Sequence, residues 1–227
     1  MNKLPAKQIY LLSIIIIGII LVIFAVFIFC TYIVVTTGEF DPTALANKDR
    51  TIIYDINGKE YATLGMENRE SITYEKLPDV LVDAIIATED SRFFEHNGVD
   101  WARFLKASFF QLLGKSEAGG ASTLTMQVSK NNISRDKTAS GIKGIVRKFT
   151  DVYVSLFKIE KNYTKDEILE RYLNTIYFGH NCFGVVSASK FYFGKTPSEL
   201  SLDECAILAG LIKSPNNYSP FKNPGRC

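Results

Sequence analysis

The chain has 227 residues, of which 26 are lysine or arginine, 24 are aspartate or glutamate and 47% are hydrophobic. A net charge of +2 gives no electrostatic case for nucleic-acid binding. The chain has only two histidines and no C-x-x-C pair, which argues against a zinc site. Its length is sufficient for one domain with a substantial core.

Hydrophobic residues are concentrated near the N-terminus, where the 25 residues from Leu11 to Val35 carry no charge. At about 1.5 Å per residue, such a helix crosses the ~30 Å hydrocarbon core of a bilayer. Signal peptides have apolar regions of only about 7–15 residues. We therefore expect a retained transmembrane anchor at 11–35 after a cytoplasmic tail, 1–10. Lys3 and Lys7 precede the anchor and acidic residues follow it, which places the N-terminus inside and the remainder outside.

The stretch 36–77 is predicted to hold a linker and a β-hairpin that forms a collar between membrane and domain. Asn57-Gly58 lies between two β-prone runs, and this dipeptide is a strong hairpin signal. From Pro78 to Cys227 the pattern is helical almost throughout. The sequence therefore predicts a mainly α fold with one domain over 78–227.

The helix boundaries follow from apolar periodicity and from capping residues. Helices are expected from Pro78 to about Ala87, over 101–113, from Thr123 to about Asn131 after an N-cap at Ser122, over about 138–160, over 167–177, over 185–193 and over 202–213. The helix at 101–113 mixes aromatic and cationic residues, so it is either a core helix or one that lies against a membrane surface. For Cys182 and Cys205, a disulfide and a small core residue at 205 both stay open.

The first candidate site segment contains Glu89, Asp90, Phe93, His96 and Gly98. Its two acids stand where a helix should end, a position that the helix macrodipole makes unfavourable for negative charge. A carboxylate held against apolar surface is desolvated, which suits a general base. The alternative is a solvated helix end followed by a glycine turn.

The second segment places Thr123, Gln127 and Lys130 at i, i+4 and i+7, on one helix face. With a capped N-terminus at Ser122 and free backbone N–H groups, such a face is suited to phosphate. An ordinary exposed helix face is the alternative.

The third segment contains Arg147, Lys148 and Asp151. Its two adjacent cations could hold a pyrophosphate, and Asp151 could supply a second carboxylate near Glu89. The alternative is a surface ion pair between Arg147 and Asp151. A fourth segment, from Lys165 to Asn174, has core-like spacing and is expected to scaffold the site.

Taken together, these segments resemble the peptidoglycan glycosyltransferases of penicillin-binding proteins and monofunctional transglycosylases. The family motif E-D-x-x-F-x-x-H-x-G is intact from Glu89 to Gly98. The motif G-x-S-T-[IL]-T-Q-Q-x-x-K-N lies at Gly120 to Asn131, with Met126 in place of the first glutamine. The motif R-K-x-x-E ends in Asp151 instead of glutamate, and the fourth motif matches Lys165 to Asn174.

The resemblance implies a lysozyme-like helical domain that acts on lipid II, with Glu89 as the base and undecaprenyl pyrophosphate as the leaving group. It implies that Lys130, Arg147 and Lys148 neutralise the pyrophosphate. A divalent cation such as Mg²⁺ or Mn²⁺ would be held partly by Asp151. The donor side would be lined by Ser122, Thr123, Gln127 and Asn131, and the site framework would consist of Asp90, Phe93, His96 and Gly98.

Two departures from the family pattern support other hypotheses. Asp151 is shorter than glutamate by ~1.5 Å, and a misplacement on the order of 1 Å can cost about 10²-fold in rate. Together with Met126, this shorter side chain supports a second hypothesis. In that hypothesis the protein is degenerate and binds lipid II or cell-wall synthesis partners without turnover. A lysozyme-type glycan-cleaving enzyme is the third, which the Arg147-Lys148 pair disfavours because cleavage has no pyrophosphate to stabilise. The chain stops at Cys227, where the family commonly continues into another helix, so the natural protein is open to being longer. No transpeptidase domain follows, and no β-lactam target is expected.

Overall fold

The computed structural model describes residues 6–36, 51–64, 70–112, 120, 122–132 and 141–226. Predictions for the linker at 37–50 and for Cys227 lie outside these residues. So does the lysine of the predicted cytoplasmic tail at position 3.

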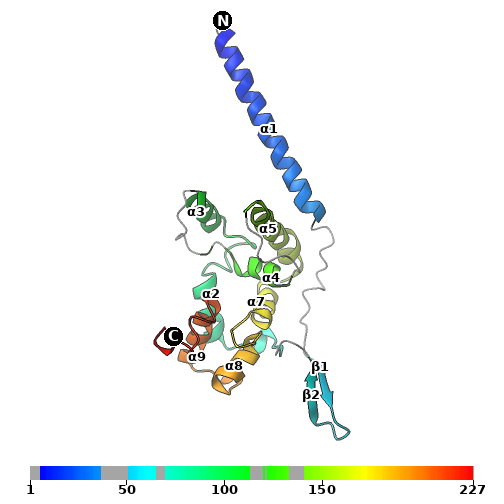
Figure 1. Ribbon diagram of the computed structural model, residues 1–227, viewed down its shortest axis with the longest axis vertical. Coiled ribbons are helices and arrows are strands. Elements are labelled where there is room, and N and C mark those ends of the chain that lie inside the picture. The colour runs from blue at the N-terminus through cyan, green and yellow to red at the C-terminus, as the bar shows by residue number, and fades with distance from the viewer. Residues whose placement is uncertain are drawn as a thin grey trace.

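A single apolar helix, α1 (Ala6–Thr36), extends away from the rest of the chain (Figure 1). Its stretch Tyr10–Val35 is long and apolar enough to cross a membrane, and none of the most apolar window is buried by protein. Near its C-terminal end, the ring of Phe29 meets Phe149 edge-on, with centroids 5.3 Å apart. The helix therefore coincides with the anchor predicted at 11–35.

The predicted hairpin is present as β1 (Thr51–Tyr54) and β2 (Glu60–Leu64), which pair antiparallel with an irregularity after Ile53. The turn between the strands spans residues 55–59. Within it, the Asp55 carboxylate accepts hydrogen bonds from the backbone N–H groups of Asn57 and Lys59, at 2.8 and 2.9 Å. The sequence predicts a collar beside the membrane anchor. Figure 1 instead shows the hairpin projecting from the end of the domain opposite α1.

The mainly α class is confirmed, since all further regular elements of the described residues are helical. They are η2 (Tyr74–Lys76), α2 (Asp79–Glu89), α3 (Trp101–Leu112), α4 (Leu124–Asn132), α5 (Gly141–Val154), the π-helical η3 (Ser155–Ile159), α6 (Glu160–Asn162), α7 (Lys165–Thr175), α8 (Val185–Phe193), η4 (Pro197–Glu199), α9 (Leu202–Lys213) and η5 (Pro224–Arg226).

Local chemistry explains most of these boundaries. Capping boxes open α7, where Thr164 and Glu167 exchange hydrogen bonds, and α9, where Ser201 and Glu204 do the same. The start of α4 corrects one prediction: the helix begins at Leu124, and its cap is not Ser122. The hydroxyl of Thr123 instead accepts from the Met126 backbone N–H at 3.2 Å.

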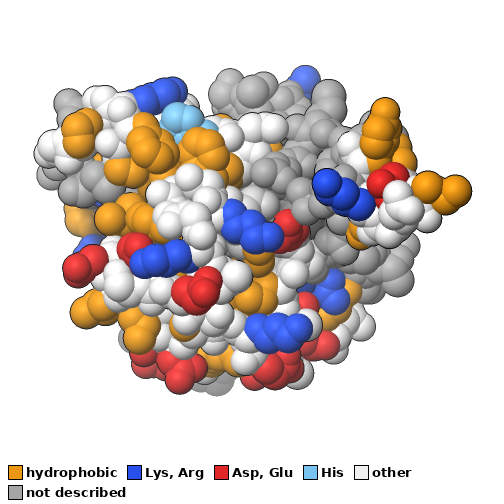
Figure 2. All heavy atoms as spheres, turned by 90° about the horizontal axis from the view of Figure 1, so that it is seen from below, with side chains coloured by type: hydrophobic (Ala, Val, Ile, Leu, Met, Phe, Trp, Pro, Cys, Tyr) orange, Lys and Arg blue, Asp and Glu red, His pale blue; other side chains and the backbone are white. Residues whose placement is uncertain are grey.

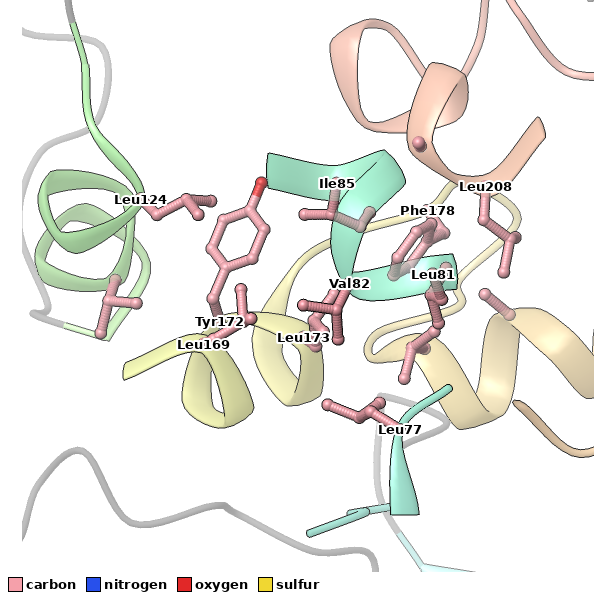
Figure 3. Packing of buried hydrophobic residues seen from close by; sticks show 14 of the residues in the cluster. Leu77, Leu81, Val82, Ile85, Leu124, Leu169, Tyr172, Leu173, Phe178 and Leu208 are labelled. Carbon is pink, nitrogen blue, oxygen red and sulfur yellow. The ribbon is translucent and has the colours of Figure 1, made fainter. Parts of the chain in front are cut away.

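The core fixes the end of α2 against α4 and α7. In Figure 3, Leu169, Tyr172 and Leu173 of α7 face Val82 and Ile85 of α2, and Leu124 of α4 closes one side. Each fully buried side chain of this size contributes about 1.5–3 kcal/mol. The same cluster contains Cys182 and Cys205 as free, buried thiols, which supports the core-residue interpretation of Cys205.

The surface differs between the two ends of the domain. The end viewed in Figure 2 carries lysine and arginine interspersed with aspartate and glutamate. Helices α3 and α5 lie at the end of the domain nearer α1 (Figure 1). Exposed apolar side chains include Trp101, Leu105 and Phe109 on α3 and Ile145 and Phe149 on α5. Phe104 on the same helix is buried, so α3 has one face in the core and another that exposes apolar side chains.

Candidate active site

Glu89 is the last residue of α2 and is half-buried. The side-chain amide of Gln127 on α4 donates to Glu89 Oε2 at 2.8 Å. The hydroxyl of Tyr172 approaches the carbonyl oxygen of the same amide at 3.4 Å. Burial, and to a lesser degree the charge of Glu89, raises the pKa of Tyr172 well above its ordinary value, so the hydroxyl stays a donor. Three helices thus hold the Glu89 carboxylate in place.

Asp90 is fully buried and joins the first two site segments. Its carboxylate accepts from the Leu124 backbone N–H at 3.0 Å and lies 3.1 Å from His96 Nε2. Arg103 of α3 reaches it at 3.5 Å. Asp90 therefore orients α4 instead of facing a substrate. The bond also corrects the expectation of free N–H groups at the start of α4, because Leu124 and Met126 already donate within the protein.

A hydrogen bond between Thr123 and Gly98 also joins the second site segment to the first. The Thr123 hydroxyl is buried and donates to the Gly98 carbonyl at 2.6 Å. Gly98 has a φ of +81°, and a Cβ there would stand 3.0 Å from Glu160 Cγ and 3.1 Å from the Ser155 carbonyl carbon. Glycine is therefore needed at this close approach to the π-helical turn.

Sequence reasoning missed a polar network beneath the site. Lys165 Nζ donates to the His96 carbonyl at 2.6 Å and to Glu160 at 2.8 Å, and it lies 4.5 Å from the centre of the Phe93 ring. Thr125 of α4 donates to the same Glu160 oxygen at 2.7 Å. Lys165 was visible as the start of the fourth segment. No local signal marks Glu160, since its partners are remote in sequence.

The cationic residues predicted to bind pyrophosphate gather where α4 and α5 meet. Lys148 Nζ donates to the Ser122 hydroxyl at 2.7 Å. Burial lowers the pKa of Lys148, while the charge of Asp151 opposes this shift and the charges of Lys130 and Arg147 add to it. Lys130 is exposed and Arg147 is half-buried, and both act on Lys148. The neighbouring Asn131 is half-buried on α4.

Asp151 is buried and accepts from the Ser129 hydroxyl at 3.2 Å. Glu89, in contrast, binds Gln127, two positions earlier on the same helix. Side chains two positions apart on an α-helix do not face each other. The two carboxylates therefore contact α4 from different sides.

A resident metal centre does not fit these residues. No group of three or more histidine, cysteine, aspartate or glutamate side chains is gathered within the part of the chain that the structure describes. Asp151, the expected ligand, offers one buried carboxylate that is already hydrogen-bonded to Ser129.

A pocket of about 430 Å³ opens beside Glu89, on the side of α9. Its lining consists of Thr88, Glu89, Ala206, Ile207, Ala209, Gly210, Lys213 and Tyr218. A positioned carboxylate beside a cavity of this size can act as a general base toward a bound hydroxyl group. The cations at the α4–α5 junction can stabilise negative charge that develops nearby.

The chain thus combines an apolar helix long enough to cross a membrane with a mainly α domain, in which neighbouring helices carry the Glu89 carboxylate and a cationic cluster. Residues 57–227 match the family described as Transglycosylase, and the chain belongs to this family. It is 42% identical over 193 residues to penicillin-binding protein 1A/1B of Bacillus subtilis (strain 168), covering 83% of this chain and 20% of that protein. It is 41% identical over 175 residues to penicillin-binding protein 1A of Escherichia coli (strain K12), covering 77% of this chain and 20% of that protein.

The chain spans about a fifth of the length of these curated relatives. A crystal structure of penicillin-binding protein 1A from Haemophilus influenzae aligns with 78% of this chain and 16% of that one, at 26% sequence identity and a TM-score of 0.39. That score is too low to support a conclusion about shared geometry. Membership of the family rests on the sequence matches.

Proposed function

We propose that this protein is a peptidoglycan glycosyltransferase that polymerises lipid II into glycan strands. The observation that carries the proposal is the Glu89 carboxylate, which Gln127 holds at 2.8 Å beside a pocket. Family membership supplies the class of reaction. The cluster of Lys130, Arg147 and Lys148 suits the anionic leaving group that such a reaction releases.

In the proposed reaction, Glu89 removes the proton from the C4 hydroxyl of the acceptor sugar. The oxygen attacks the anomeric carbon of the growing chain as the bond to pyrophosphate breaks on the opposite face. This displacement inverts the anomeric carbon and releases undecaprenyl pyrophosphate. A general base must lie about 2.6–3.2 Å from the atom that it deprotonates. Gln127 supports this geometry because it restrains the carboxylate.

Three cations would stabilise the pyrophosphate as negative charge develops on it. Lys148 is held in position by its hydrogen bond to the Ser122 hydroxyl and by burial. Thr123 would support the site without touching the substrate, since its hydroxyl donates a hydrogen bond to the Gly98 carbonyl. A divalent cation is proposed only as a companion of the substrate, because Mg²⁺ often binds through substrate phosphates and one or two carboxylates. The donor side would also include Gln127 and Asn131.

We further propose that α1 crosses the cytoplasmic membrane once, with its N-terminus inside and the domain outside. Basic residues ahead of the span support this orientation. Helices α3 and α5 carry exposed apolar side chains and lie at the end of the domain nearer α1 (Figure 1), which suits contact with the membrane surface from which a lipid-linked substrate is drawn.

The test uses purified full-length protein with labelled lipid II and a divalent cation, beside a Glu89→Gln control. Polymer made by the wild type alone supports the proposal. Binding of lipid II without polymer would contradict it in favour of a degenerate binding protein. Breakdown of a preformed glycan would identify a glycan-cleaving enzyme.

A further inference from the structure

The helix that carries Lys148 contains a turn of unusual geometry. Helices α5, η3 and α6 follow one another without a break and form one helix, which we call the α5–α6 helix. Within it, the backbone N–H of Glu160 donates to the carbonyl of Ser155, five positions earlier. An α-helix joins groups four positions apart, so this π-helical turn accommodates one additional residue. The Ser155 hydroxyl donates to the Asp151 carbonyl at 2.7 Å, which ties the turn to the residues before it.

The additional residue changes which side chains share a face of the α5–α6 helix. Asp151 and Glu160 are nine positions apart. In a regular α-helix this separation is about two and a half turns, which directs the two side chains to opposite faces. With one residue taken up by the π-helical turn, the same side chains stand only about 80° apart. The turn therefore brings the two carboxylates to one side of the helix.

Both carboxylates bind α4 through hydroxyl groups. Thr125 donates to Glu160 Oε1 at 2.7 Å, and Ser129 donates to Asp151 Oδ1 at 3.2 Å. Thr125 and Ser129 stand at i and i+4, so they share one face of α4. Both are fully buried, Asp151 is buried, and the side chain of Glu160 is only 9% exposed. A regular α-helix could present only one of these carboxylates to that face, so the pair of contacts depends on the π-helical turn.

The opposite face of α4 holds the proposed general base. Gln127 lies midway between Thr125 and Ser129, and its amide donates to Glu89 at 2.8 Å. Side chains two positions apart on a helix do not face each other. One helix therefore contacts the base on one side and the α5–α6 helix, which carries Lys148, on the other. An inverting displacement needs the base at the attacking oxygen and the cations at the leaving group at the same time. The way in which the α5–α6 helix packs on α4 sets the distance between them.

We propose that Thr125, Ser129 and Glu160 are positioning residues that, together with the π-helical turn, hold the α5–α6 helix on α4 and so fix Lys148 relative to Glu89. These residues do not touch the substrate and act through Lys148. For the effect on reaction rate, this inference rests on the proposed function. The position of Lys148 is a property of the fold and can be measured without activity.

The test compares two double variants of the full-length protein. Thr125→Val combined with Ser129→Ala removes both hydroxyl groups that bind the α5–α6 helix. Thr175→Val combined with Ser189→Ala is the matched control, because these hydroxyl groups are also buried but donate to carbonyl oxygens of their own helices. Both double variants lose one threonine and one serine hydroxyl from the interior. A difference between them therefore reports the contacts with the α5–α6 helix.

The first measurement is the pKa of Lys148, obtained from the pH dependence of its labelling by an amine-reactive reagent and followed by mass spectrometry. All variants are labelled well below their thermal midpoints. Burial lowers this pKa, so release of the helix from α4 should move it upward toward that of an ordinary lysine. The control should leave the pKa unchanged, and so should Thr125→Ser, which keeps the hydroxyl. An unchanged pKa in the variant that combines Thr125→Val with Ser129→Ala would overturn the inference.

The second measurement is lipid II polymerisation by the same variants. A misplacement on the order of 1 Å can cost about 10²-fold in rate, so the variant at Thr125 and Ser129 should lose roughly tenfold or more in kcat. The KM for lipid II should stay within about threefold, because the cations act mainly on charge that develops in the transition state. An equal loss of kcat in the control would contradict the effect on rate.

The two measurements separate the two levels of inference. A raised pKa of Lys148 with a wild-type kcat would support the positioning of Lys148 and contradict its role toward the leaving group. If the wild type makes no polymer, the proposed function fails by itself. The labelling of Lys148 then still decides whether the contacts between α4 and the α5–α6 helix fix its position.

Discussion

Gln127 donates its side-chain amide to Glu89 across 38 positions of sequence, at 2.8 Å. Tyr172 stands behind this amide at 3.4 Å and orients it, since a hydroxyl that stays protonated can only pair with the amide carbonyl as a donor. The carboxylate of Glu89 is therefore restrained from α4 and, through Gln127, from α7. Restraint of this kind is what a general base needs in order to meet a substrate hydroxyl in a productive geometry.

Asp90 and Glu89 are adjacent, yet substitutions at the two positions are expected to change the stability of the protein by different amounts. Asp90→Ala removes the buried acceptor of the Leu124 N–H and of His96, so the free energy of unfolding should fall by about 3 kcal/mol. Denaturant titration measures the loss. Glu89→Gln, at a half-buried position, is the control and should change stability by less than about 1 kcal/mol. Equal stability losses in the two variants would contradict a framework role that is specific to Asp90.

Gly98 tests the close approach between the first segment and the π-helical turn. Gly98→Ala should destabilise the protein by about 2 kcal/mol or more, because φ is +81° and the new Cβ would press on Glu160 and Ser155. Gly58→Ala is a matched control, since φ is +76° there but nothing lies within 4 Å. The difference between their thermal midpoints isolates the contact from the backbone strain, and equal midpoints would refute the packing argument.

The lowered pKa of Lys148 predicts that kcat/KM depends on pH in the alkaline range. Burial lowers its pKa, so it loses its positive charge at a lower pH than an ordinary lysine. If its charge stabilises the leaving pyrophosphate, kcat/KM should fall as the pH rises through this lowered pKa. In Lys148→Arg, where the charge persists, the alkaline limb of the profile should move to higher pH. An alkaline limb that stays in place would show that another group controls it.

Asp151→Glu tests the departure from the family motif. Extending a buried side chain costs about 1–3 kcal/mol, so the thermal midpoint should fall by several degrees. If reach limits the carboxylate, kcat/KM should be kept or should rise despite this loss. Ser129→Ala, which removes the hydrogen bond to Asp151, separates the effect of that contact from the effect of length. Complete loss of activity at an unchanged midpoint would show that the local backbone has adapted to aspartate.

Sequence patterns were sufficient where the determining contacts are local. The Asn57-Gly58 turn, the Ser201 cap of α9 and the apolar anchor all depend on residues within a few positions of one another. The start of α4 was misplaced by one residue, because the choice between Ser122 and Thr123 depends on the remote carbonyl of Gly98.

The parts of the site that could not be predicted all depend on long-range contacts. Glu160 looks like a surface residue in sequence, but it binds Thr125 from 35 positions away. The π-helical turn from Ser155 to Ile159 interrupts a helix whose sequence pattern is uninterrupted. The free N–H groups expected at the start of α4 were lost to Asp90, which no spacing rule reveals.

The most direct test of the general-base role is the rate of lipid II polymerisation by Glu89→Gln, measured beside its thermal midpoint. The variant keeps the size of the side chain and a polar partner for Gln127, but it cannot accept the proton. Polymerisation should fall by about 10²–10⁴-fold while the midpoint stays near that of the wild type. Polymerisation within a few-fold of the wild-type rate would contradict the assignment of Glu89 as the base.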